Sequence, residues 1–337
     1  MRKSFLIMAA IVSLNMMAGS ISEFQKQSNI NYVGDDKVYH ALDIYFPKED
    51  AQTKHPVIIH IYGSAWASNN MKGSADLSTV GVAALEAGYI FVAPNHRSYN
   101  DALFPAQIND IKAVVRYLRG NAEALGIDTS FIAMSGFSSG AHLAVLMGVT
   151  RNVADFTVGS TMMDIEGNIG NYTNESSWIH AVCDWSGPID EKDEGCGVSI
   201  LGHVQDNLVG CSAEQCPDKH ALIGAYAYLD ASDAPMMVVH GSSDNVVPIC
   251  MGQRFYEMLQ QTGVDAEWYQ HSGEHTVAAE FTDEMITFFN RVKGSVQAIE
   301  SPSLQGRSGE ASKVIRDGVL LIERNGRTYN AQGAQVR

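Results

Sequence analysis

The chain has 337 residues, of which 45% are hydrophobic and 18% charged, enough for one large globular domain or two smaller ones. Its formal net charge is -15. No basic stripe interrupts this acidity, so nucleic acids and anionic membrane surfaces are poor partners.

The first twenty residues predict a secretory signal peptide. Arg2 and Lys3 give a positive start, residues 5–12 form a short apolar segment, and residues 16–20 end in small side chains. No cysteine follows the apolar segment, which argues against a lipid anchor, and no other apolar run is long enough to span a bilayer. We therefore expect a secreted or periplasmic protein, with the cell surface as a further option.

The five cysteines fit an oxidising compartment outside the cytoplasm. Cys211 and Cys216 flank a short polar loop and are expected to pair with each other, and the odd count leaves at least one thiol free. Metal binding is the alternative for this pair, but no second Cys or His pair follows at zinc-finger spacing. The sequence predicts no metal and no cofactor. The remaining cysteines are Cys183, Cys196 and Cys250.

The first half of the chain alternates short apolar runs of strand length with amphipathic helical segments. This alternation predicts an α/β fold with a mostly parallel central sheet and helices on both faces. The expected strands cover residues 29–33, 40–46, 55–62 and 89–93, and the expected helices cover 78–87 and 105–119.

Residues 131–143 contain the sequence Gly136-Phe137-Ser138-Ser139-Gly140 between an apolar strand and a helix. This is the G-x-S-x-G nucleophile elbow in the strand–turn–helix setting that it requires. A serine hydroxyl is a weak nucleophile at neutral pH and needs exposure, a nearby base and donors for an oxyanion. Ser138 is the predicted nucleophile, and the Ser139 amide is one predicted oxyanion donor. The alternative is an ordinary turn of small residues.

The loop that follows the strand at 55–62 is Gly63-Ser64-Ala65-Trp66. Small residues directly after a central strand allow backbone N–H groups to face a cavity, and in α/β-hydrolases this loop supplies the second half of the oxyanion hole. The usual His-Gly-Gly-Gly is absent here. Ser64 is the favoured donor and Ala65 the second, and a tight loop without catalytic duty is the alternative.

Asp244 and His275 complete the expected constellation. Asp244 follows the strand at 235–240, His275 follows the strand at 267–270, and the order nucleophile, acid, base is that of the α/β-hydrolase triad. His275 would take and return the Ser138 proton, while Asp244 would fix the tautomer of His275. His271 is the rival base; His275 is preferred because it lies deeper in the loop, next to the closing helix.

Two further segments lie between these motifs. Residues 150–180 lose the strand–helix pattern and combine Gly, Asn and Ser with Met162 and Met163, which predicts a partial lid over the pocket. Residues 191–220 form a cysteine-bearing loop.

Five segments carry a resemblance to a known family, and they are residues 62–66, 104–110, 136–140, 184–188 and 240–244. Through these segments the chain resembles hormone-sensitive-lipase-like α/β-hydrolase esterases. The closer resemblance is to secreted bacterial feruloyl and acetyl xylan esterases, which trim plant cell-wall polysaccharide. It implies hydrolysis of carboxylic esters, on acylated carbohydrate or a small ester, through an acyl-enzyme, without specifying the acyl group. Trp66 and Trp185 either line a pocket for an aromatic acid or belong to the core.

The expected organisation is a signal peptide at 1–20, a catalytic domain at 21–297 and a separate tail at 301–337. Two hairpin-turn signals in the tail, Asp317-Gly318 and Asn325-Gly326, predict a meander of three short strands. The tail resembles C-terminal segments of secreted Bacteroidetes proteins, some of which are export signals. A small hairpin without a targeting role is the alternative.

Other functions compete with the esterase hypothesis. A generic short-chain carboxylesterase or a peptidase could use the same fold, although a peptidase of this kind would need a site for the peptide N-terminus or a propeller, and no repeats suggest one. A carbohydrate-binding protein on a relic hydrolase fold is the non-enzymatic alternative. A metal-dependent deacetylase is disfavoured, because the His and Asp residues do not cluster at ligand spacing. The oligomeric state is not predicted.

Overall fold

The structure is a computed structural model that describes most of the chain. The described residues are 19–48, 53–151, 153–190, 196, 202–300, 311–316, 319–324, 327–330 and 335–336. The chain divides into two compact units, Met1–Val296 and Gln297–Arg337. The predicted signal peptide therefore falls almost entirely outside the described residues.

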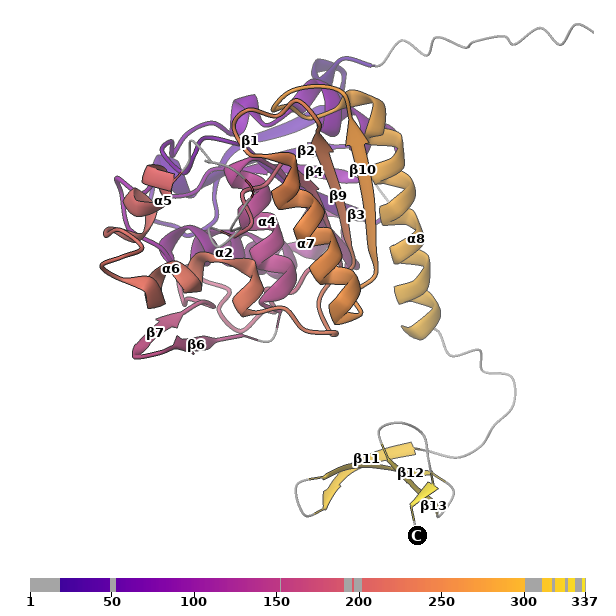
Figure 1. The fold of residues 1–337 in the computed structure, drawn as a ribbon. Coiled ribbons are helices and arrows are strands. Elements are labelled where there is room, and N and C mark those ends of the chain that lie inside the picture. The colour runs from indigo at the N-terminus through magenta and orange to yellow at the C-terminus, as the bar shows by residue number, and fades with distance from the viewer. Residues whose placement is uncertain are drawn as a thin grey trace, which may run out of the picture. The chain divides into compact units, whose positions relative to one another are not determined.

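An eight-stranded sheet forms the centre of the first unit, with strand order β1-β2-β4-β3-β5-β8-β9-β10 (Figure 1). β1 and β2 are antiparallel to their neighbours, and all the other pairs are parallel. The sheet is thus mostly parallel, as the sequence predicts. The strands are β1 (Gln25–Asn31), β2 (Ala41–Phe46), β3 (His55–Ile61), β4 (Ile90–Pro94), β5 (Ile127–Phe137), β8 (Ala181–Trp185), β9 (Met236–Gly241) and β10 (Ala266–His271).

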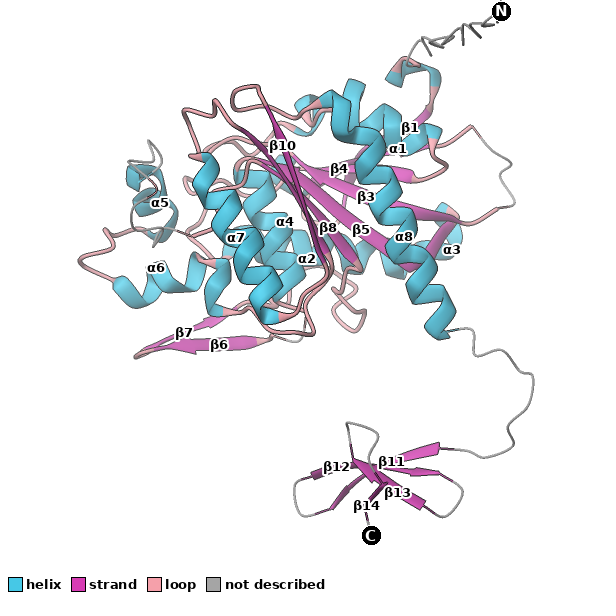
Figure 2. Ribbon diagram, turned by 45° about the vertical axis from the view of Figure 1, so that its right-hand side comes forward, coloured by secondary structure: helices cyan, strands magenta, loops and turns pink. Residues whose placement is uncertain are grey.

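Helices cover both faces of this sheet. α2, α4 and α7 lie on one face, and α1 and α8 lie on the other (Figure 2). The helices are α1 (Val82–Glu86), α2 (Ala106–Gly120), α3 (Ala122–Leu125), α4 (Ser139–Val149), α5 (Gly202–Val209), α6 (Pro217–Ile223), α7 (Ile249–Thr262) and α8 (Thr282–Glu300). Single turns are η1 (Ile21–Glu23), η2 (Val38–His40), η3 (Lys72–Ser74), η4 (Leu77–Gly81), η5 (Ala225–Ala227) and η6 (Ala279–Phe281).

The central strands are apolar on both sides because both sides are buried. In β3, Val57 and Ile59 pack with α2 residues such as Ile108 and Ile111, whereas Ile58 faces the cluster that contains α1 and α8. All of these side chains are fully buried. This double burial explains why the strand reads as a continuous apolar run in the sequence.

The strand order reverses at β3, which lies between β4 on one side and β5 on the other. In open parallel sheets a crevice forms at the carboxyl ends of the strands where the order reverses, and ligands bind there. The loops after β3, β5, β9 and β10 all leave from this carboxyl edge. The fold therefore gathers the loops that contain the predicted site residues.

The segment 150–180 is not a lid over this edge. It begins where α4 ends and finishes where β8 begins, which is the amino edge of the parallel sheet. Its hairpin, β6 (Asp155–Val158) and β7 (Thr161–Asp164), lies at the lower edge in Figure 1, opposite the carboxyl ends of β9 and β10. Glu166 pairs with Lys112 and Arg116 of α2, so the segment packs on that helix. The lid prediction is wrong.

The second unit contains four antiparallel strands in the order β11-β12-β13-β14. They are β11 (Ala311–Arg316), β12 (Val319–Arg324), β13 (Arg327–Asn330) and β14 (Gln335–Val336). The predicted meander is therefore present, with one strand more than expected. Both predicted turn dipeptides lie outside the described residues.

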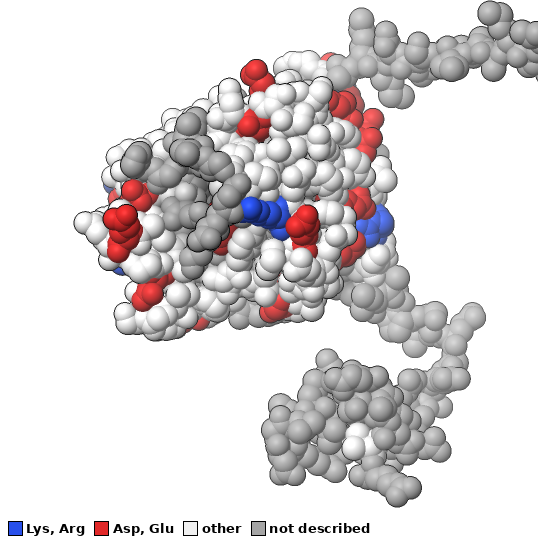
Figure 3. Space-filling view, in the orientation of Figure 1, with Lys and Arg blue, Asp and Glu red and all other residues white. Residues whose placement is uncertain are grey.

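Acidic side chains are spread over the face of the molecule shown in Figure 3, with Lys and Arg visible at few places. This distribution agrees with the net charge of -15. Among the described residues, none of the helices combines the length and apolar character needed to cross a bilayer.

Candidate active site

Ser138 lies in the sharp turn between β5 and α4. Its backbone has φ 55° and ψ -123°, a positive-φ conformation outside the left-handed helical region that is strained for a residue with a side chain. The turn is also tight: a Cβ atom at Gly136 would collide with the backbone of Gly140, and one at Gly140 would collide with the Ile61 carbonyl. Such a turn raises a serine above the sheet, as a nucleophile elbow requires.

Asp244 and His275 meet at the same edge of the sheet. His275 Nδ1 lies 2.7 Å from Asp244 Oδ2. Burial by itself raises the pKa of the Asp244 carboxyl, but hydrogen bonds from His240, His275 and the Val246 and Val247 amides outweigh it and hold that pKa well below its usual range. Asp244 is therefore a buried carboxylate directed at the imidazole.

The His275 ring lies next to the elbow. Its centroid is 4.7 Å from that of Phe137, the residue before Ser138. Because Nδ1 faces Asp244, the Nε2 atom is the nitrogen left for a reacting group. The structure thus brings the three predicted triad residues to one edge of the sheet.

His271 does not share this arrangement. It is buried at the end of β10, and its Nδ1 accepts a hydrogen bond from the Gly273 amide at 3.1 Å. Among the described residues, its Nε2 has no hydrogen-bond partner. The geometry therefore favours His275 over this rival, in line with the sequence-based preference.

His240 is a neighbour of the triad to which the sequence analysis gave no role. Its Nε2 lies 2.9 Å from the Val247 carbonyl and 3.4 Å from Asp244 Oδ2. A carbonyl oxygen can only accept a hydrogen bond, so His240 Nε2 carries a proton. Its N–H group lies between the Val247 carbonyl and Asp244 Oδ2. The sequence signal available was the position of His240, four residues before the predicted acid.

The loop after β3 lies directly against the elbow. A Cβ atom at Gly63 would come within 2.9 Å of Ser138 Cβ, so only glycine fits there. The Ser64 amide donates a hydrogen bond to Ser139 Oγ at 2.9 Å. Ala65 and Trp66 both have positive φ, 50° and 56°. The three predicted oxyanion residues, Ser64, Ala65 and Ser139, are therefore adjacent in space. The Ser64 amide is already bonded to Ser139 Oγ, however, which corrects the prediction that Ser64 is the favoured donor.

Trp66 and Trp185 are core residues, which corrects the option that they line a substrate pocket. Both indoles are fully buried. The Trp66 ring packs edge-on against His142 of α4 at 5.1 Å, and Trp185 Nε1 donates to Ser135 Oγ at 3.0 Å. A side chain with no exposed surface has none to offer a substrate.

Two disulfides are present, Cys211–Cys216 and Cys196–Cys250. The first confirms the pairing expected from the sequence. The second ties the cysteine-bearing loop to the first turn of α7, and Cys196 packs there against Val247 and Met251, close to the loop that holds Asp244. Cys183 is the free, buried cysteine.

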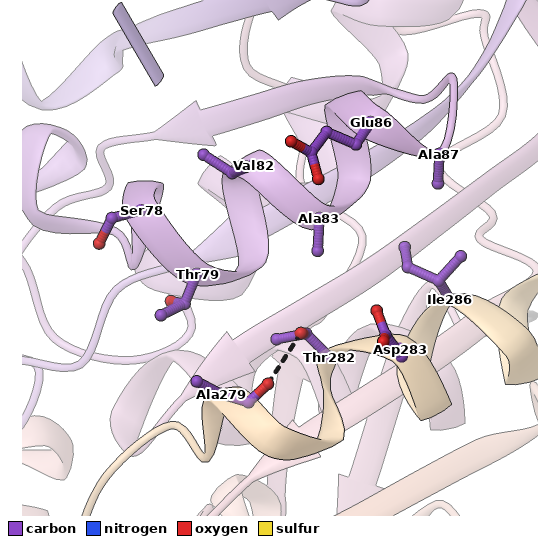
Figure 4. Close-up of a pocket in the computed structure, with 10 residues that line it drawn as sticks. All are labelled: Ser78, Thr79, Val82, Ala83, Glu86, Ala87, Ala279, Thr282, Asp283 and Ile286. Carbon is purple, nitrogen blue, oxygen red and sulfur yellow. Dashed lines mark hydrogen bonds between the residues drawn. The ribbon is translucent and has the colours of Figure 1, made fainter. Parts of the chain in front are cut away.

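A cavity of about 460 Å³ lies away from these loops, between the α1 region and the start of α8 (Figure 4). Its lining includes Ser78, Glu86 and Asp283, and none of the predicted site residues. Within the described part of the chain, no cluster of His, Cys, Asp and Glu has the arrangement of a metal site.

Asp184 is a fully buried carboxyl group near His240. Desolvation raises its pKa to about 6, despite attraction to His240 and a hydrogen bond from the Gly187 amide. The unfolded chain loses this proton near pH 3.8, whereas the folded chain keeps it until about pH 6. The contribution of Asp184 to the free energy of unfolding is therefore present at acid pH, and it is lost as the pH rises from about 3.8 to about 6.

We expect the Asp184→Asn variant to be more stable than the wild type above pH 6 and equally stable near pH 4. The neutral amide still accepts from Gly187 and never ionises, so the difference should open between these values and reach about 3 kcal/mol at most. Urea unfolding at several pH values would measure it. A difference that does not change with pH would show that ionisation of Asp184 is not its cause.

Comparisons with known proteins agree with this geometry. The BD-FAE family model matches residues 42–259. A solved structure described as a truncated form of carbohydrate esterase from gut microbiota is 37% identical and superposes with a TM-score of 0.76, covering 80% of this chain and 96% of that one. The bifunctional GH43-CE protein of Bacteroides eggerthii is 40% identical, also with a TM-score of 0.76, covering 80% of this chain and 35% of that one.

Curated relatives are more distant. Esterase LipC of Mycobacterium tuberculosis is 29% identical over 238 residues, which are 67% of this chain and 53% of that protein. The chain spans about half the length of the curated relatives that it matches. The predicted α/β-hydrolase fold and the esterase class of the domain are confirmed by these relatives. The family match covers more than half of the sequence, and the chain belongs to the BD-FAE family.

Proposed function

We propose that this chain is a secreted serine carboxylic ester hydrolase that removes acetyl or feruloyl groups from plant cell-wall polysaccharide. The observation that carries the proposal is the position of His275, which lies 2.7 Å from the buried Asp244 carboxylate and packs against Phe137, next to the strained Ser138. A nucleophile, a base and a group that orients the base are the three parts that acyl transfer needs.

The first half of the reaction forms the acyl-enzyme. Ser138 Oγ attacks the ester carbonyl carbon while His275 Nε2 takes the hydroxyl proton, and Asp244 stabilises the resulting imidazolium. Backbone amides from the loop after β3 and from the start of α4 hold the oxyanion. The carbon–oxygen bond to the alcohol then breaks, and the imidazolium gives its proton to the leaving sugar oxygen, which departs as a hydroxyl.

The second half repeats these steps with water. His275 takes a proton from a water molecule, whose oxygen attacks the acyl carbon, and the bond to Ser138 Oγ breaks. The proton returns to Ser138, and the carboxylic acid leaves. Neither half needs a metal or a cofactor.

The carbohydrate part of the proposal depends on relatives. The two solved proteins at 37% and 40% identity are described as carbohydrate esterases or as containing one, and the chain covers 96% of the first. Three of the five sequence segments that suggested a polysaccharide esterase, 62–66, 136–140 and 240–244, lie at the ends of β3, β5 and β9, where the candidate site forms. Acetyl and feruloyl groups are both esters of sugar hydroxyls, so one mechanism serves either.

An activity screen would test this function. Purified protein would be incubated with acetylated xylan, methyl ferulate and p-nitrophenyl acetate, with chemically deacetylated xylan as the blank. We expect release of acetate from xylan or of ferulate from its ester, together with turnover of the nitrophenyl ester. Hydrolysis of the nitrophenyl ester alone would contradict the carbohydrate part, and no hydrolysis at all would contradict the esterase function.

Export is part of the same proposal. The signal-like first twenty residues and the two disulfides support a protein that matures outside the reducing cytoplasm. We propose the C-terminal unit as a second export element, because it is a separate unit with its own sheet. The intact mass of the exported protein should lack the leader, and an unprocessed mass would contradict this.

A further inference from the structure

The Ser139 side chain connects the two halves of the candidate oxyanion hole. Its Oγ accepts the hydrogen bond from the Ser64 amide at 2.9 Å, although 75 residues separate the two positions. Ser139 is the first residue of α4 and is only 1% exposed. This bond therefore joins the loop after β3 to the helix that begins at the elbow, and we call it the Ser139 latch.

The latch decides which amides are free to hold an oxyanion. The Ser64 N–H group already has an acceptor, so it is not available to a substrate oxygen. The amides of Ala65 and Ser139 have no acceptor in the described part of the chain. Ser139 N–H also lies at the positive end of a helix, which favours a developing negative charge. The free donors are therefore Ala65 and Ser139.

The loop needs such a restraint because its backbone is strained. Ala65 and Trp66 are consecutive non-glycine residues with φ of 50° and 56°. A positive φ is unfavourable for a residue with a side chain, so the loop would relax unless contacts hold it. On the far side of Ala65, the Trp66 carbonyl accepts from the Tyr99 amide at 3.0 Å, and the indole is buried against His142. On the near side, the Ser64 carbonyl accepts from the Ala67 amide at 3.0 Å within the turn, and the latch adds the bond that ties this turn to α4.

We propose that the Ser139 hydroxyl is a positioning group that aims the Ala65 amide at the oxyanion, alongside the amide of Ser139 itself. The inference deepens the proposed esterase function and rests on it. The hydroxyl touches no reacting atom in this scheme. It acts by tying the Gly63–Ser64 peptide to the start of α4, and so positions the following Ala65 amide relative to the Ser139 amide.

The main test compares Ser139→Ala with Ser139→Thr, because alanine removes the acceptor and threonine keeps it. We expect kcat for p-nitrophenyl acetate to fall about 10- to 100-fold in Ser139→Ala with KM nearly unchanged, somewhat less than the loss of a donor itself. Ser139→Thr should recover most of the loss. Ser186→Ala is the matched control, since Ser186 is also buried at a strand end and its Oγ has no partner among the described residues.

A trifluoromethyl ketone inhibitor separates positioning from general damage. Ser138 adds to its carbonyl carbon to give a hemiketal, and the carbonyl oxygen becomes an oxyanion in the proposed hole. Its inhibition constant should weaken in Ser139→Ala by the same factor as kcat/KM, while KM stays the same. Thermal unfolding of each variant shows whether it is folded.

The outcomes are distinct. Wild-type protein without esterase activity would defeat the proposed function. Active wild type with an equally active Ser139→Ala variant would overturn the latch alone. An equal loss in the alanine and threonine variants, both folded, would also overturn it, because packing rather than the hydroxyl would then be responsible.

Discussion

Replacing Ser138 by alanine should abolish hydrolysis of p-nitrophenyl acetate, with kcat falling by about 10⁶-fold toward the uncatalysed rate. The reason is that Ser138 supplies the oxygen that forms the acyl-enzyme, and water attacks the acyl carbon only after that intermediate has formed. Alanine keeps the Cβ atom and the backbone turn, so the variant should fold with the thermal stability of the wild type. Initial rates at saturating substrate measure the effect.

A fluorophosphonate probe gives an independent readout of the same residue. The wild type should be labelled at one site per chain, and Ser138→Ala should not be labelled. Ser160→Ala is a suitable control, because Ser160 lies in the exposed turn between β6 and β7 and should leave both rate and labelling unchanged. An unlabelled wild type would support the relic, carbohydrate-binding alternative, and turnover by Ser138→Ala would remove Ser138 from the mechanism.

The sequence predicts the triad residues well because, in a parallel sheet, every residue that directly follows a strand lies at the same edge of the sheet. A serine in a strand–turn–helix motif, an acid and a histidine after later strands must all emerge at the carboxyl edge of a parallel sheet. Ser138, Asp244 and His275 are found at that edge, on the loops after β5, β9 and β10. Their order alone therefore indicated their proximity.

The sequence misleads where the outcome depends on contacts between distant segments. Aromatic character cannot distinguish a wall of a pocket from the core, and Trp66 and Trp185 are buried by partners on α4 and β5. The pairing of the Ser64 amide with Ser139 Oγ is likewise invisible, since neither residue type marks it. Such contacts follow from tertiary packing and not from a local pattern.

The lid prediction failed for a different reason. The composition of residues 150–180 suggested mobility and substrate contact, but the position of the segment is fixed by what precedes it. α4 starts at the elbow and runs back across the sheet, so whatever follows Val149 begins at the opposite edge. Following the chain direction through β5 and α4 would have placed the start of this segment at the amino edge of the sheet.

Replacing Asp244 by asparagine should lower kcat by about 10³- to 10⁴-fold at pH 7–8 with little change in KM. Asp244 Oδ1 accepts from the Val246 and Val247 amides, both at 2.9 Å, and Oδ2 accepts from His275 Nδ1 at 2.7 Å. The two backbone donors require an oxygen on their side. The amide nitrogen of asparagine must then face His275.

This orientation reverses the hydrogen bond to the base. The asparagine NH₂ group donates to His275 Nδ1, so the imidazole proton moves to Nε2. With a proton already bound, Nε2 can no longer accept the proton of Ser138. His240 adds to the effect, because its Nε2–H also points toward the replaced oxygen at 3.4 Å and would meet a second donor there. The variant would thus hold the base in the wrong tautomer.

Asp265→Asn is the matched control for this substitution. Asp265 lies on the surface in a partly exposed ion pair with Arg291, so the same chemical change there should leave kcat within about twofold, since exposed ion pairs contribute little. A folded Asp244→Asn variant that kept more than a tenth of the wild-type kcat would show that another group orients His275. Because Ser138, Ser139 and the oxyanion loop are untouched in this variant, such a result would revise the acid and leave the nucleophile in place.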